Sequence, residues 1–359
     1  MVALHISDSC PIIEPLGIVC RGGPVNGPFV AGALLSGKRI LAERNIPISR
    51  IYTNSGPTPA AALAAIGMED RACSIWARLK PTDIIDITQS WWSKAMTVSR
   101  IVRSESIFPS TGLERLVREI IPADELFSSD SIPLSIMTVD YPSGNPLMFD
   151  TRDPAFYPVI HEGILGSMAL TPFLRLQVIW CGPKGLSPKR KTGDDFPVAL
   201  MDGGFRDNLM IEQACRDGMK TLLVIDINGL KISPPPTESW KHWANPLLRA
   251  FHALITTNDQ RNLYGATRVN EELAIRNELE KLCTRADVSD PARSALDAIL
   301  NRMDNGRLGL AEKHDIRVHF VSEPKSSIPF DFASFTQQET EHLISAGNRA
   351  ACVTLKALR

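Results

Sequence analysis

Ser55 and Asp202 are the two residues of this chain whose types and surroundings suit acyl-transfer chemistry. Ser55 follows a short β-type run at 50–52 and lies in a tight turn of glycine and proline before an alanine-rich helix. Strand, sharp turn with a serine, then helix is the arrangement of a nucleophile elbow, which exposes the hydroxyl near the positive end of the helix. Thr53 and Pro57 stand where the elbow usually has glycine, so the stretch taken alone fits ordinary turn chemistry as well.

Asp202 ends an apolar strand at 198–201 and is followed by Gly203 and Gly204. Asp-Gly by itself is common turn chemistry. In a parallel sheet, however, the loops at the carboxyl ends of the strands lie at one edge and build the site. We therefore expect Asp202 to end a strand of a parallel sheet at the same edge as Ser55.

A glycine-rich loop lies between the first apolar strand, 16–20, and the first helical pattern. Its residues are Gly22, Gly23, Pro24, Val25, Asn26 and Gly27. The loop has neither the Gly-Lys-Ser/Thr of a P-loop nor a Gly-x-Gly-x-x-Gly pattern. A glycine-rich loop before a helix presents backbone N–H groups to an anion. Two interpretations stay open here, an oxyanion-binding loop and a plain tight turn.

The elements that position these residues alternate between strand and helix, which predicts an α/β fold with right-handed crossovers. We expect three layers, αβα, with a mainly parallel central sheet and a helical C-terminal part. The whole chain, 1–359, is read as a single domain, with a core at about 16–230 and a mostly helical part at 231–359. Within it the sequence predicts helices at 110–121 and 153–165, a hairpin at 133–149, a last strand at 316–321 and a last helix at 339–358.

The start of the helix after Ser55 carries a specific expectation. Proline is favoured at the first helical position, and threonine is a good N-cap. We therefore expect the helix to begin at Pro59, with Thr58 as its N-cap. Ser55 would then lie a few residues outside the helix, where its hydroxyl feels less of the helix dipole.

Composition narrows the function classes. Hydrophobic residues make up 44% of the chain and charged residues 22%, as in a globular protein with a large core. The 39 basic and 40 acidic residues nearly cancel, so nothing suggests a nucleic-acid partner. The seven cysteines are dispersed, which is typical of free thiols in a reducing compartment, and no metal or cofactor motif is visible. Residues 1–15 do not resemble a signal peptide and no segment is long and apolar enough to span a membrane, which favours a cytoplasmic location.

Two stretches of the sequence suggest contact with a lipid surface. In 81–108 the aromatic residues Trp91 and Trp92 are interspersed with cations, as in an interfacial lid. The alternative is a surface helix whose apolar stripe packs on the core. The run 189–191 is Lys-Arg-Lys in a charged loop, which is either a solvated tip or a phospholipid-facing patch. Peripheral membrane contact is thus a hypothesis from these patterns.

Together these blocks resemble the patatin-like phospholipases, a family of serine lipid acyl hydrolases. The resemblance runs from about Leu16 to Ile227 and rests on four blocks in the family's order. They are the glycine-rich loop, the turn around Ser55, the segment 166–173 and the Asp202 block. The third block reads Gly-Ser-Met-Ala-Leu-Thr-Pro-Phe and is similar to the family's Ala-Ser-x-Ala-x-Pro-x-Phe. The fourth reads Asp-Gly-Gly-x-x-x-Asn, ending at Asn208.

The resemblance implies a serine esterase with a Ser55–Asp202 dyad that forms an acyl-enzyme on lipid or phospholipid esters, without a cofactor or metal. It also implies an oxyanion loop at Gly22 to Gly27, and motif residues Asn54, Gly56, Gly203 and Gly204 beside the dyad. The chain departs from the family's pattern at four positions. Pro24 replaces a loop glycine and has no N–H, Asn26 replaces a basic residue, and Thr53 and Pro57 replace the elbow glycines. These departures motivate an alternative, a catalytically impaired patatin-fold protein that acts as a lipid-binding or regulatory module.

Overall fold

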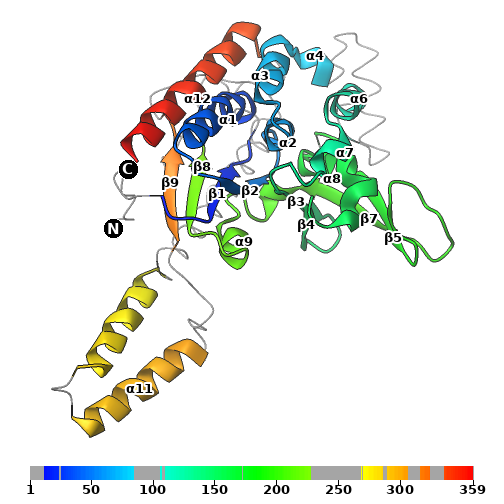
Figure 1. Cartoon of the computed structure of the whole chain (residues 1–359). Coiled ribbons are helices and arrows are strands. Elements are labelled where there is room, and N and C mark those ends of the chain that lie inside the picture. The colour runs from blue at the N-terminus through cyan, green and yellow to red at the C-terminus, as the bar shows by residue number, and fades with distance from the viewer. Residues whose placement is uncertain are drawn as a thin grey trace, which may run out of the picture.

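The computed structural model describes residues 12–23, 26–84, 106, 110–171, 173–227, 268, 270–285, 289–305, 316–323 and 335–358. The strands in these ranges form one sheet in the order β6-β5-β7-β3-β2-β1-β8-β9, with β4 paired to β3. Helices lie on both faces of the sheet (Figure 1). The fold is therefore the three-layer α/β arrangement that the sequence predicts.

The five strands at the centre and one side of the sheet are parallel. They are β3 (Leu134–Asp140), β2 (Ile48–Thr53), β1 (Leu16–Cys20), β8 (Thr221–Ile225) and β9 (Arg317–Val321). Cys20 at the end of β1 pairs with Thr53 on one side and with Ile225 on the other, so the carboxyl ends of three strands are level. The chain leaves β1 into the glycine-rich loop and leaves β2 into the Ser55 turn at this edge.

The other side of the sheet is antiparallel and corrects one expectation. Strand β7 (Phe196–Asp202) runs antiparallel to β3, with Asp202 opposite Thr138, so Asp202 does not end a parallel strand. The first residues of β7 pair with β5 (Gln177–Gly182) beyond the end of β3. Thr53 of β2 pairs with Ile136, two residues before Thr138. The strand thus enters the sheet from outside its carboxyl edge and still brings Asp202 to the level of the Ser55 turn.

The residues of each central strand alternate between two apolar clusters, one on each face of the sheet. On β1, Ile18 and Cys20 belong to the larger cluster and Val19 to the smaller one. The larger cluster includes side chains of α1 (Asn26–Glu43), α2 (Thr58–Ala65), α8 (Ile160–Ser167) and α12 (Gln337–Ala357). The smaller cluster lies under α9 (Ile211–Arg216). Burial of both faces explains why the central strands read as nearly continuous apolar runs.

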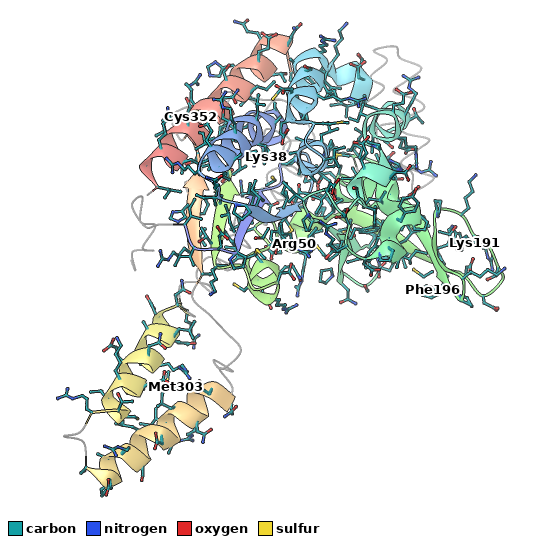
Figure 2. The ribbon with its side chains drawn as sticks, viewed as in Figure 1. Lys38, Arg50, Lys191, Phe196, Met303 and Cys352 are labelled. Atoms are coloured by element: carbon teal, nitrogen blue, oxygen red, sulfur yellow. The ribbon has the colours of Figure 1, made fainter. Side chains whose placement is uncertain are left out.

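The remaining described elements are short. They are α3 (Glu69–Arg78), α4 (Pro81–Ile84), α6 (Thr111–Ile120), α7 (Ala123–Leu126), β4 (Pro146–Asp150), η1 (Pro154–Val159), β6 (Gly185–Ser187) and η2 (Gly203–Phe205). The predicted helix at 110–121 is α6, the predicted helical stretch at 153–165 is η1 followed by α8, and the predicted hairpin is β3–β4. On β2, Arg50 (labelled in Figure 2) hydrogen-bonds Asp150 at 2.5 Å and so ties that hairpin to the sheet.

The C-terminal part contains a pair of helices that lies apart from the sheet (Figure 1). The first helix covers 270–283 and the second is α11 (Asp290–Asn305), which has no buried residue and carries Met303 of Figure 2. Two hydrogen bonds from Arg276 to Asp304, at 2.5 and 3.0 Å, join the helices. The predicted last strand and helix are β9 and α12. The reading of 1–359 as a single domain stays a prediction.

The two stretches that suggested lipid contact differ in what the structure says of them. Trp91 and Trp92 lie outside the described residues. The 189–191 run is exposed in the loop between β6 (Gly185–Ser187) and β7, which projects from the sheet where Figure 2 shows Lys191 and Phe196. The guanidinium carbon of Arg190 lies 5.6 Å from the centre of the Trp180 ring. Among the described helices, none has a stretch of sufficient length and hydropathy to span a bilayer.

Candidate active site

Ser55 lies in a strained turn between β2 and α2. Its backbone has φ 57°, a left-handed conformation that is uncommon for residues other than glycine. The turn is closed by a 3.0 Å hydrogen bond from the Thr58 N–H to the Ser55 carbonyl, while the Ser55 N–H donates to the Ser167 carbonyl at 2.9 Å. Backbone strain of this kind persists only where the surroundings enforce it, and it clusters at functional sites. The turn therefore has the shape of a nucleophile elbow with Thr53 and Pro57 in the glycine positions.

The helix after the elbow begins earlier than expected. The structure has α2 starting at Thr58, with Pro57 as the N-cap in a helical conformation, and the Ala61 N–H donates to the Pro57 carbonyl at 3.0 Å. The expectation of a start at Pro59 with a Thr58 cap is therefore wrong. The Thr58 hydroxyl is used elsewhere, since it forms a 3.0 Å hydrogen bond with the Ser167 hydroxyl. Ser55 lies three positions before the helix, closer to its positive end than we predicted.

The Ser55 hydroxyl donates to Asp202 Oδ2 at 2.6 Å, so the two halves of the predicted dyad are in hydrogen-bond contact. The other carboxyl oxygen, Oδ1, accepts from the Gly204 N–H at 2.8 Å. Gly203 must be glycine, because a Cβ there would overlap the backbone of Met137 on β3. The carboxyl group is thus held on both oxygens, with one of them aimed at the serine.

Burial changes the acidity of this carboxyl group. Asp202 is 1% exposed, and desolvation raises its pKa from 3.8 to about 7, although the hydrogen bonds from Ser55 and Gly204 oppose the rise. A general base works best when its pKa lies near the working pH. The site therefore has a proton acceptor matched to neutral solution without a histidine.

The segment 167–169 anchors both members of this pair. The Ser167 carbonyl accepts from the Ser55 N–H at 2.9 Å, and the Ala169 carbonyl accepts from the Asp202 N–H at 3.2 Å. Ser167 is fully buried, and its hydroxyl bonds the Ile164 carbonyl at 2.8 Å as well as Thr58. In the sequence this segment contributed only to the family resemblance, and no role was predicted for it.

The glycine-rich loop borders Ser55 at Gly22. A Cβ on Gly22 would lie 3.0 Å from the Ser55 Cβ and would overlap the side-chain oxygens of Asn54 and Asn208. Gly23 has φ 129°, which favours glycine. Pro24 lies outside the described residues, so what it does in the loop stays a prediction. Within the described part of the chain, no hydrogen bond uses the N–H groups of Gly23 or Gly56.

Asn26 lies at the first position of α1 and ties the loop to the next strand. Its amide nitrogen donates to the carbonyls of Arg21 and Gly22 at 3.1 and 3.0 Å and to Asp226 Oδ1 at 3.3 Å. Its amide oxygen accepts from the Ile227 N–H at 3.2 Å. Asp226 also pairs with Arg21 at 3.0 Å. Sequence reasoning missed Arg21 and Asp226, although Asp226 directly follows β8 at the same edge of the sheet as Ser55.

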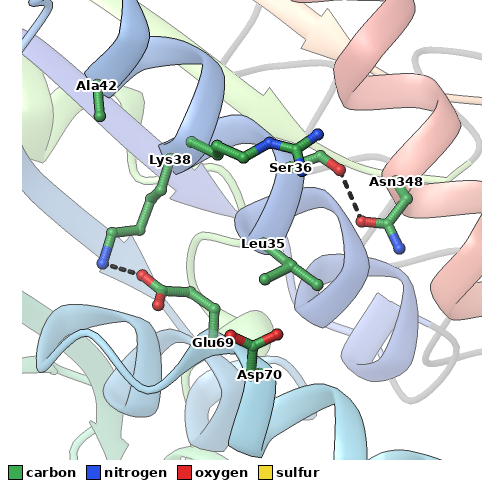
Figure 3. Close-up of a pocket in the computed structure, with 8 residues that line it drawn as sticks. Leu35, Ser36, Lys38, Ala42, Glu69, Asp70 and Asn348 are labelled. Carbon is green, nitrogen blue, oxygen red and sulfur yellow. Dashed lines mark hydrogen bonds and ion pairs between the residues drawn. The ribbon is translucent and has the colours of Figure 1, made fainter.

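The remaining predicted site residues lie around this centre. Gly27 packs so closely on the Trp76 ring that a Cβ would overlap it. An open groove lined by both polar and apolar residues lies elsewhere, between α1, α3 and α12. There Ser36 bonds Asn348 at 2.8 Å and Lys38 pairs with Glu69 (Figure 3). No loop or dyad residue lines it. Among the described residues, no group of three or more His, Cys, Asp or Glu is arranged to hold a metal ion.

Comparison with known proteins gives three findings. The sequence model of the patatin-like phospholipase family matches residues 18–215, which is more than half of the chain. The crystal structure of VipD from Legionella pneumophila aligns over 96% of this chain and 67% of that one, with a TM-score of 0.42 and 12% sequence identity. No curated protein matches the chain.

Proposed function

This chain belongs to the patatin-like phospholipase family, and we propose that it is a serine lipid acyl hydrolase that uses Ser55 as nucleophile and Asp202 as general base. The observation that carries the proposal is the 2.6 Å hydrogen bond between the Ser55 hydroxyl and Asp202 Oδ2. It is supported by the left-handed backbone of Ser55 and by the raised pKa of Asp202. The substrates are carboxylic esters of lipids, as the name of the family indicates.

In the acylation step the Ser55 Oγ attacks the ester carbonyl carbon while its proton passes to Asp202 Oδ2. The carbonyl oxygen takes the electron pair and becomes an oxyanion. Asp202 then returns the proton to the alcohol oxygen as the carbon–oxygen bond breaks, which leaves an acyl group on Ser55. Water repeats the sequence with Asp202 as its base and releases the fatty acid.

The oxyanion needs donors, and the loop offers few. Pro24 has no N–H to give, so the candidates are the backbone N–H groups of Gly23 and of Gly56, the residue after the nucleophile. One preorganised donor contributes roughly 10²–10³ in rate. We expect the protein to hydrolyse esters more slowly than a relative with a third loop glycine, rather than to be inert.

The alternative is a binding or regulatory protein with the same fold, and the missing Pro24 N–H is the observation that favours it. A serine-directed fluorophosphonate separates the two. We expect it to label the wild type and not Ser55→Ala, and we expect Asp202→Ala to be labelled at least tenfold more slowly.

Turnover is then measured on p-nitrophenyl esters and on phospholipid vesicles, with Ser55→Ala as the blank. Serine-dependent release of fatty acid from the vesicles would support the lipid assignment. Equal rates for the wild type and Ser55→Ala on every ester would rule out the dyad and leave the binding protein.

A further inference from the structure

Two buried asparagines beside Ser55 have side-chain oxygens without a conventional partner. Neither Asn54 Oδ1 nor Asn208 Oδ1 accepts a hydrogen bond from any residue that the structure describes. Their nitrogens are both used, since Asn54 Nδ2 donates to the Asp207 carbonyl at 2.9 Å and Asn208 Nδ2 to the Gly22 carbonyl at 3.4 Å. The nitrogen bonds fix which way each amide faces. Buried polar atoms are almost always paired, so these two oxygens require an explanation.

Both oxygens face the same Cα atom. A Cβ built on Gly22 would overlap Asn54 Oδ1 and Asn208 Oδ1 together, so one Cα–H bond of Gly22 points between them. Cα–H groups act as weak donors to oxygen. Gly22 is therefore clasped between two amide oxygens, with the Ser55 Cβ on the same side.

The carbonyl of Gly22 is held as well. It accepts from Asn26 Nδ2 at 3.0 Å and from Asn208 Nδ2 at 3.4 Å. In a planar trans peptide the carbonyl of one residue and the N–H of the next point in opposite directions. Fixing the Gly22 carbonyl toward the two amides therefore turns the Gly23 N–H away from them, where no described group takes it up.

We propose that Asn208 is a positioning residue, which together with Asn26 sets the plane of the Gly22–Gly23 peptide and so aims the Gly23 N–H at the oxyanion. The inference rests on the proposed esterase function. Asn208 follows Asp202 by six residues and lies opposite the loop, so one segment supplies the base and orients the donor. The oriented Gly23 N–H would thus compensate in part for the hydrogen bond that Pro24, which has no N–H, cannot donate to the oxyanion.

The test compares the wild type, Asn208→Ala and a matched control, Asn348→Ala. Asn348 is half-buried, whereas Asn208 is fully buried, and its replacement likewise removes one side-chain hydrogen bond, to Ser36. It lies in the groove of Figure 3, away from Ser55. On p-nitrophenyl butyrate we expect Asn208→Ala to lower kcat about 10- to 100-fold with KM within twofold, while the control keeps the wild-type kcat. An unchanged kcat in Asn208→Ala would overturn the proposal.

Inhibitor binding distinguishes aiming from general loosening. A trifluoromethyl ketone forms an oxyanion on Ser55, and an ether of the same chain length does not. The ketone should bind Asn208→Ala about 10- to 100-fold more weakly, with ether binding unchanged; equal losses for both would contradict a role in aiming. Asn208→Asp keeps the shape and removes the donor, so it should reproduce the loss if the alanine variant does not fold.

Hydrogen exchange keeps the inference separate from the proposed function. We expect peptides covering residues 21–27 to take up deuterium faster in Asn208→Ala than in the wild type or in Asn348→Ala. If fluorophosphonate fails to label the wild type, the esterase proposal falls, and faster uptake still supports the part of the inference that concerns the loop. Unchanged uptake refutes it whether or not the protein is an esterase.

Discussion

Replacing Asp202 with asparagine should inactivate the protein and raise its free energy of unfolding. The size of this stabilisation depends on pH. In the folded protein, burial raises the pKa of this carboxyl from 3.8 to about 7. Between these pH values the folded state binds a proton that the unfolded chain has already released, so the wild type loses stability as pH rises through this window. Asparagine carries no charge at any pH, so the Asp202→Asn variant does not lose this stability as pH rises.

The size of the effect follows from the two pKa values. They differ by about three pH units, and each unit corresponds to about 1.4 kcal/mol, so ionisation of buried Asp202 costs about 4 kcal/mol at pH 8. At pH 5 only the interval from 3.8 to 5 contributes, and the cost of ionisation is about 2 kcal/mol. Below pH 3.8 it vanishes. The interval from pH 5 to about 7 covers about two of these units, so Asp202→Asn should gain about 3 kcal/mol over the wild type between pH 5 and pH 8, on top of any constant difference.

Urea unfolding at pH 5, 6 and 8 measures this gain, with tryptophan fluorescence as the signal. Asp195→Asn is a suitable control, because hydrogen bonds from Thr192 and the Lys191 N–H hold the pKa of Asp195 below its usual value. That carboxyl is ionised throughout the range, so its replacement should shift stability equally at all three pH values. If Asp202→Asn also differs from the wild type by a constant amount, Asp202 does not titrate in this window, and the raised pKa that supports it as the base is refuted.

Other predictions concern the same centre. Because Asp202 must be ionised to accept a proton, kcat/KM on p-nitrophenyl butyrate should fall about tenfold per pH unit below pH 7 and level off above it; a flat profile would contradict this. Ser55→Gly should be about 1 kcal/mol more stable in urea than Ser55→Ala, since glycine accepts a φ of 57° without strain, and equal stabilities would mean that the turn is relaxed. Gly22→Ala should lower kcat by at least about 100-fold, whereas Gly37→Ala, whose added methyl would lie 3.7 Å from Leu355, should not; similar rates would show that Gly22 is not clasped.

The contact between Ser55 and Asp202 was predicted from a rule that holds for parallel strands, whose carboxyl ends lie at one edge of the sheet. The rule places Ser55 after β2, but it does not apply to Asp202, because β7 is antiparallel to β3. The direction of β7 was not predictable, since apolar alternation is the same whichever way a strand runs. Asp202 comes to the predicted edge from the opposite direction, paired with Thr138.

The start of α2 and the task of Asn26 depend on partners far away in the chain. Local capping preference favours Thr58 as N-cap, but Ser167, 109 residues later, takes its hydroxyl. Compared with the family's loop, Asn26 replaces a basic residue and so removes a positive charge. In the structure it is a cross-link to Asp226 and Ile227, 200 residues or more away, and no local pattern indicates such a bond.

The carbonyls of Ser167 and Ala169 hold the backbone of both proposed catalytic residues from one short stretch of chain. Because both backbones are bonded to this stretch, we expect a displacement of it to move the proposed nucleophile and base in the same direction, and to change their separation less than their positions. The 2.6 Å hydrogen bond between Ser55 and Asp202 should then be less sensitive to motions of the surrounding sheet and helices. We expect an insertion between Ser167 and Ala169 to uncouple the two without altering either proposed catalytic side chain.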